Sequence, residues 1–116
     1  MALHVKFWYN KIKSLKEASM SEKELILQKL SALKAQLAPN YHITSLALFG
    51  SMARDEATEK SDVDVLIDFS QTPDLLTFIE LEEKLKIALG KNVDLVPKRK
   101  LRAELSQSIL KEAIAV

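Results

Sequence analysis

The sequence predicts a single α/β (α+β) domain in which a small mixed β-sheet is flanked by helices. Segments with apolar residues at helical spacing alternate with short apolar runs rich in β-branched residues. The chain has 116 residues, which is enough for one modest hydrophobic core. Its 47% hydrophobic and 28% charged residues are typical of a soluble globular protein.

Charge and composition exclude several kinds of site. The formal net charge is +1, so no bulk attraction to nucleic acid or to a membrane surface is implied. The absence of cysteine excludes disulfides and thiolate metal ligands, and it fits the cytoplasm, where we expect the protein. No apolar run approaches the roughly 20 residues that span a bilayer. We therefore expect neither a membrane partner nor direct nucleic-acid binding.

The first 19 residues differ in character from the rest of the chain. They hold four lysines and one glutamate, a net charge of +3, and an aromatic run at residues 7–9. The following "SMSEKELILQKL" resembles a fresh start, with a serine that can cap a helix. We divide the chain into an extension or extra helix, residues 1–19, and a domain, residues 20–116. The extension is an upstream start, a partner-binding arm or a helix packed on the domain.

The first half of the domain is expected to form a helix, a strand and a short helical turn. Apolar spacing predicts a helix over residues 21–38, and Pro39 is expected to stop it. The apolar run at residues 42–49 predicts a strand that is buried on both faces and ends at Gly50. Residues 51–57 then predict a short helical turn.

The second half adds two strands and two helices. Residues 62–69 alternate between polar and apolar side chains, which predicts a half-buried strand. A strong helical pattern at 74–89 ends at Gly90, a typical helix C-cap. A short strand is predicted at 92–97 and a last amphipathic helix at 99–115. The sheet should therefore contain about three strands.

Three aspartates stand out in the predicted strands. Asp62 and Asp64 share one face, about 7 Å apart for a rise of about 3.4 Å per residue. Such a pair repels unless a cation lies beside it, and Mg²⁺ prefers this kind of oxygen ligand. Asp94 lies between apolar residues, where an unpaired buried carboxylate would be costly. If the last two strands pair, three acids line one patch that can hold two metals for phosphoryl transfer.

A place for phosphate precedes the acidic strand. Gly50 and Ser51 follow an apolar strand and open a helical turn, whose free N–H groups can bind an anion. Arg54, one turn on, can reach a phosphate or an aspartate. Ser61 can cap or orient the loop that leads into the acidic strand, or it can bind the nucleotide directly. Each signal is weak alone, but their order along the chain is specific.

The ordered pattern resembles the DNA polymerase β nucleotidyltransferase superfamily, and in particular its minimal nucleotidyltransferase (MNT) domain. The matching segments are "GSMARDEATEKSDVDVLIDF" and "NVDLVP". The resemblance implies that the Gly-Ser pair binds the phosphates of a nucleotide. It implies that Asp62, Asp64 and Asp94 hold the metals, with Asp94 also activating the attacking hydroxyl. Asp55 departs from the family pattern, which usually has glycine there, although aspartate tolerates left-handed backbone.

The resemblance and the small size together imply a partner. MNT proteins of this size resemble antitoxins encoded beside HEPN-domain ribonuclease toxins. The implied reaction is Mg²⁺-dependent transfer of AMP from ATP to a tyrosine hydroxyl of the cognate HEPN toxin. Two alternatives stay open: an antitoxin that neutralises its toxin by forming a complex without catalysis, and a small-molecule nucleotidyltransferase.

Overall fold

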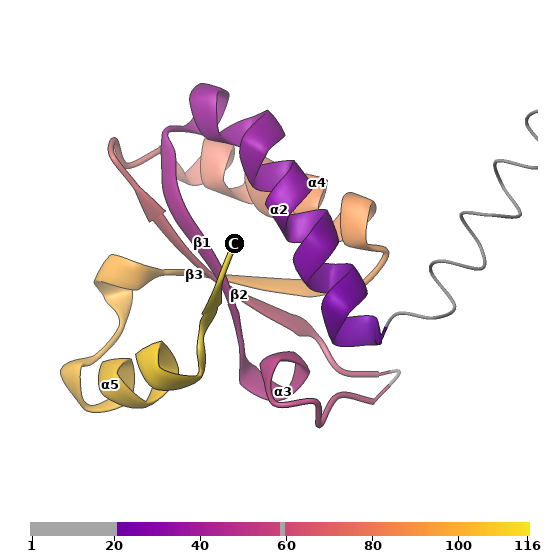
Figure 1. Cartoon of the computed structure of the whole chain (residues 1–116). Coiled ribbons are helices and arrows are strands. Elements are labelled where there is room, and N and C mark those ends of the chain that lie inside the picture. The colour runs from indigo at the N-terminus through magenta and orange to yellow at the C-terminus, as the bar shows by residue number, and fades with distance from the viewer. Residues whose placement is uncertain (1–20, 59) are drawn as a thin grey trace, which may run out of the picture.

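The computed structural model describes residues 21–58 and 60–116. The predicted extension at residues 1–19 lies outside the described residues. Within them, a mixed sheet is flanked by helices, which confirms the predicted fold class (Figure 1). No helix in the described part of the chain combines the length and apolar character needed to cross a membrane.

Four strands form the sheet in the order β3-β2-β1-β4. They are β1 (Ile43–Phe49), β2 (Val63–Phe69), β3 (Val93–Pro97) and β4 (Ile114–Ala115). β1 pairs antiparallel with both β2 and β4, whereas β2 pairs parallel with β3. This pairing confirms that the predicted second and third strands are neighbours.

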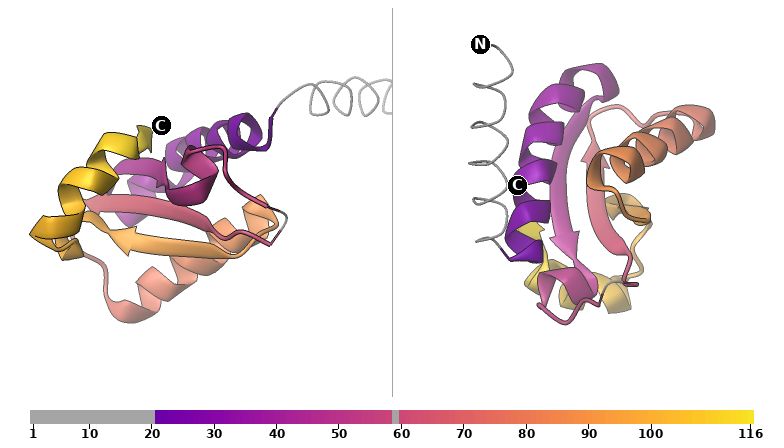
Figure 2. Two further views of the ribbon diagram at one scale, coloured as in Figure 1. Left: turned by 90° about the horizontal axis from the view of Figure 1, so that it is seen from below. Right: turned by 90° about the vertical axis from the view of Figure 1, so that its right-hand side faces the viewer.

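The helices separate into two groups. Helices α2 (Glu22–Tyr41) and α4 (Leu75–Leu89) contact each other and pack on β1 and β3, respectively. Their buried leucines meet the apolar face of β2 in one core. Helices α3 (Gly50–Ala53) and α5 (Ala103–Glu112) lie beside each other and away from α4 (Figures 1 and 2). The polar face of β2 therefore looks away from the main core.

Two local predictions need correction. The first helix does not stop at Pro39 but continues to Tyr41, and the left-handed His42, with φ of 57°, caps it. Pro39 removes one helical hydrogen bond, that of its own missing N–H, and the buried Tyr41 ring holds the last turn in place. β1 begins one residue later than expected, because His42 caps α2, and it is not buried on both faces, because Thr44 is exposed. Helix α4 and its C-cap Gly90, with φ of 67°, are confirmed.

The predicted final helix is wrong in its extent. A 3₁₀ turn, η1 (Lys98–Lys100), precedes α5, which ends at Glu112. The chain then forms β4, where Ile114 pairs with Leu48 and Ala115 pairs with Ala47. Helical spacing is a local signal, whereas β4 forms because the edge of β1 offers unpaired backbone groups. The sheet therefore has four strands rather than three.

Candidate active site

The site begins where β1 ends against β2. Phe49, the last residue of β1, is the register partner of Asp64 on β2. The next residue, Gly50, has a φ of +75°, a backbone conformation that glycine adopts without strain. A Cβ atom on Gly50 would overlap the Asp64 carboxylate and lie 3.0 Å from its Cγ. Glycine is therefore required twice, for the backbone angle and for the close approach of the carboxylate.

A second carboxylate lies beside the first. Asp94 on β3 is the register partner of Asp64 on the parallel strand β2. Asp64 is half-buried, and burial followed by the charges of Asp94 and Asp62 raises the pKa of its carboxyl group. Opposite charge on Arg54 acts in the other direction and lowers that pKa. The structure thus gathers negative charge at this point of the sheet.

Asp94 itself corrects one argument from the sequence. We expected its position between apolar residues to bury it, but Asp94 is exposed while Val93 and Leu95 are buried. Alternate side chains of a strand point to opposite faces, and β3 lies at the edge of the sheet. Asp94 is therefore accessible to a second reactant, and no burial cost has to be relieved by a metal.

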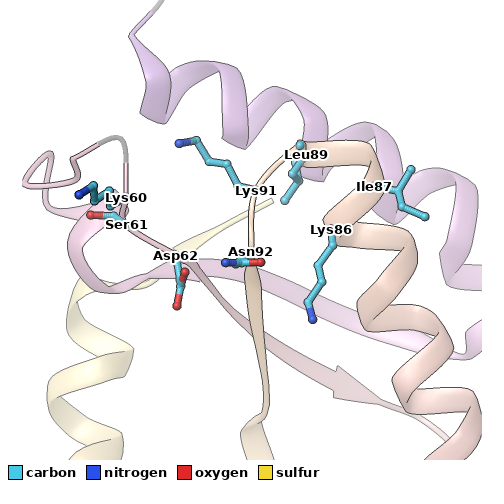
Figure 3. A pocket seen from close by; sticks show the side chains of 9 residues that line it. Lys60, Ser61, Asp62, Lys86, Ile87, Leu89, Lys91 and Asn92 are labelled. Atoms are coloured by element: carbon cyan, nitrogen blue, oxygen red, sulfur yellow. The ribbon is translucent and has the colours of Figure 1, made fainter.

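Asp62 and Ser61 lie just before β2. Asp62 is exposed and lines an open groove of about 580 Å³ beside Lys60 and Lys86 (Figure 3). Ser61 instead shapes the loop: its Oγ accepts a hydrogen bond from the Thr58 N–H at 2.9 Å, and its own N–H donates to the Thr58 carbonyl at 3.0 Å. This arrangement fits the expected orienting role of Ser61.

The anion-binding groups are occupied by a residue that the sequence did not indicate. The Gly50 N–H donates to Glu112 Oε1 at 3.1 Å, and an Arg54 guanidinium N–H donates to Glu112 Oε2 at 2.9 Å. Arg54 Nε also donates to Glu56 Oε2 at 3.1 Å. The Arg54 guanidinium and then the Gly50 N–H lower the pKa of Glu112, which keeps it ionised. No sequence signal indicates Glu112, because it is 62 residues from Gly50.

The helical turn is shorter than the one expected at residues 51–57, because α3 ends at Ala53 and a non-helical turn follows it. Asp55 has a φ of +58°, the left-handed conformation that aspartate was expected to tolerate in place of glycine. Its carboxylate pairs with the Lys23 ammonium at 3.5 Å, which places opposite charge beside it. Ser51 is half-buried, and its carbonyl accepts the Glu56 N–H at 2.9 Å, which closes the turn.

The carboxylates of the site suit a magnesium ion that takes its other ligands from water and substrate. Within residues 21–58 and 60–116, no three His, Cys, Asp or Glu side chains come together as a group that could hold a metal ion. Mg²⁺ commonly takes one or two carboxylates and completes its shell with water and substrate phosphates. Asp64 and Asp94, adjacent in register with Asp62 close enough to raise the pKa of Asp64, fit that pattern.

Fold and site together define a class of protein. A glycine turn whose N–H holds a carboxylate, set against carboxylates on adjacent strands, offers groups that suit a phosphate and a divalent cation. In agreement, residues 26–116 match the nucleotidyltransferase domain family, and the chain belongs to that family. The predicted family membership and the nucleotidyltransferase activity are thereby confirmed.

The chain is also similar to particular known proteins within this family. Protein adenylyltransferase MntA of Thermococcus cleftensis is 45% identical over 87 residues, which span 75% of this chain and 88% of that protein. A solved structure assigned as a minimal nucleotidyltransferase is 34% identical, with a TM-score of 0.69, and the match covers 84% of this chain and 98% of that one. A complex of tri-AMPylated Shewanella oneidensis HEPN toxin with MNT antitoxin is 27% identical, with a TM-score of 0.60, over 80% of this chain and 70% of that one.

Proposed function

We propose that this protein is the antitoxin of a HEPN/MNT pair and transfers AMP from ATP to a tyrosine hydroxyl of its HEPN toxin. One observation carries the chemical part of the proposal: Asp64 and Asp94 lie side by side in register, with Asp64 against Gly50. The partner is supported by the similarity to an MNT antitoxin in complex with an AMPylated HEPN toxin. ATP as the donor also supports the cytoplasm as the compartment.

The roles of the residues follow from their positions. We assign the Gly50 N–H, the Ser51 hydroxyl and the Arg54 guanidinium to the phosphates of ATP, with Ser61 holding the neighbouring loop. We assign Asp62, Asp64 and Asp94 to two Mg²⁺ ions. When bound, Mg²⁺ would neutralise negative charge on the α-phosphate and on the departing pyrophosphate. The raised pKa of Asp64 supports a cation there, because a positive ion offsets the repulsion among the carboxylates.

The AMP transfer needs a base that accepts the proton of the attacking hydroxyl. The tyrosine oxygen attacks the α-phosphorus of ATP, the bond to the β-phosphate oxygen breaks, and pyrophosphate leaves. Asp94 is the carboxylate best placed to accept the hydroxyl proton, because it is exposed at the edge of the sheet and adjoins Asp64. A protein acceptor can approach that edge without opening the core.

The test is to incubate the protein with ATP, Mg²⁺ and its cognate toxin and to weigh the toxin by intact mass spectrometry. We expect added AMP groups, located on tyrosine by fragmentation, and their loss with Asp62→Asn/Asp64→Asn. Asp68→Asn is the matched control, since Asp68 lies on the same strand but pairs with Arg99 at 3.3 Å. AMP transfer without Mg²⁺ would refute the metal assignment.

Neutralisation of the toxin separates this proposal from a non-catalytic antitoxin. If the enzyme silences the toxin by AMP transfer, loss of all three carboxylates should restore the ribonuclease activity of the toxin. Neutralisation that survives this loss would favour inhibition by complex formation. Modification of a small hydroxylated molecule in the absence of any protein partner would instead favour a small-molecule nucleotidyltransferase.

A further inference from the structure

We propose that Glu112 is a built-in competitor of the nucleotide: its carboxylate occupies the donors assigned to phosphate, and ATP must displace it. The inference rests on the proposed function, because it presumes that Gly50 and Arg54 receive the phosphates. It adds a regulatory contact that holds the free protein in a state of low nucleotide affinity.

The contacts of Glu112 resemble those of a bound anion. One carboxylate oxygen accepts the Gly50 N–H at 3.1 Å, and the other accepts an Arg54 N–H at 2.9 Å. Both oxygens are thus engaged, each by a different donor of the candidate phosphate site. The side chain of Glu112 is 25% exposed, so it is half-buried where it meets the two donors. Charge-assisted hydrogen bonds of this kind are stronger than neutral ones.

Glu112 and a phosphate compete for the Gly50 N–H and crowd each other at Arg54. The backbone N–H of Gly50 carries one hydrogen, which is already directed at Glu112 Oε1. Arg54 has further N–H groups, but its Nε already serves Glu56. A phosphate that entered while the Glu112 carboxylate stayed would lie a few ångströms from a like charge, with strong repulsion. For a phosphate to take the Gly50 N–H, the Glu112 side chain must therefore leave.

The fold holds Glu112 in this place by strand pairing. β4 pairs with β1 so that Ile114 faces Leu48 and Ala115 faces Ala47. The same antiparallel register, continued by two residues, brings Glu112 opposite Gly50. Glu112 is also the last residue of α5, so an ordered helix and a paired strand flank it on either side (Figure 1). The pairing of β4 with β1 therefore holds Glu112 next to Gly50.

Other roles for Glu112 predict the opposite effect on binding. If Glu112 held Arg54 in position for ATP, or served as a metal ligand, its removal would weaken nucleotide binding. If it competes with phosphate, its removal strengthens binding. The direction of the change in affinity therefore decides between these roles.

The experiment measures binding of AMP-PNP with Mg²⁺ by isothermal titration calorimetry, without the toxin. The proteins are the wild type, Glu112→Ala, Glu112→Gln, and Glu80→Gln as a charge-matched control on α4, where Glu80 pairs only with Lys84 among the ion pairs of the described residues. We expect Glu112→Ala to lower the Kd about tenfold, which equals about 1.4 kcal/mol. Glu112→Gln should lower it less, because the amide oxygen still accepts a hydrogen bond. Glu80→Gln should match the wild type.

Other values of the Kd would overturn the role proposed for Glu112. A Kd for both Glu112 variants within about twofold of the wild type, or a higher one, overturns the inference. Nucleotide binding and AMP transfer by the wild type would then leave the proposed function intact. Absence of binding in every protein would overturn both. Glu112→Gln has nearly the volume of the native side chain, so it provides the measurement even if Glu112→Ala folds poorly.

Discussion

Gly50→Ala should damage the protein in two separable ways. The native φ of +75° is strained for alanine, and the new Cβ would overlap the Asp64 carboxylate. Left-handed backbone costs a non-glycine residue about 1 kcal/mol. Forcing Asp64 aside adds about 2 kcal/mol, a typical penalty for overpacking. The sum of about 3 kcal/mol lowers the melting temperature by about 12 °C for a domain near this size.

Gly90→Ala is the matched control for this prediction. Gly90 has a similar φ of +67°, but a Cβ there would meet no atom within 4 Å. The control therefore isolates the backbone term, about 1 kcal/mol or about 4 °C. Thermal unfolding followed by circular dichroism measures both variants, and AMP transfer to the toxin reports on the displaced carboxylate. Equal melting temperatures for the two variants, with transfer preserved in Gly50→Ala, would refute the close contact of Gly50 with Asp64.

Variants at three further residues test the charges and the sheet edge. Burial and neighbouring carboxylates raise the pKa of Asp64 in the folded protein. The protonated carboxyl group therefore favours folding at a pH below its unfolded pKa, about 3.9. This contribution to stability is lost as the pH rises through the pKa of the folded protein. Asp64→Asn should therefore melt higher than the wild type at pH 7 in chelator, and a lower melting temperature would contradict this. Hydrogen bonds from Thr77 lower the pKa of Asp74, so its contribution is present above its unfolded pKa and lost as pH falls through the folded value. Asp74→Ala should lower the melting temperature at pH 7 and much less at pH 2, whereas an equal loss at both would refute a charge effect. Glu82 accepts the Leu95 N–H of the edge strand at 3.2 Å, so Glu82→Ala should cost about 1 kcal/mol in denaturant unfolding and Glu82→Gln almost nothing.

The sequence by itself determined the acidic strand and the turn before it. Alternation along residues 62–69 predicted which side chains face the core, and Val63 and Val65 are buried while Asp64 is half-buried. The left-handed backbone at Asp55 agrees with the expectation, drawn from the glycine usual in the family, that aspartate tolerates such a backbone here. These features were accessible because each depends on a few consecutive residues, whose period and backbone preference are local properties of the chain.

Only the tertiary structure decided what surrounds that strand. It exposed Asp94, formed β4 from residues expected to be helical, and set Glu112 against Gly50. Each of these depends on segments that are distant in sequence. Asp94 is exposed because β3 lies at the edge of the sheet. β4 has only two residues, which are too few to show a strand periodicity in the sequence. The Gly50–Glu112 contact follows from the register of β4 on β1, which arises only when the open edge of β1 is paired.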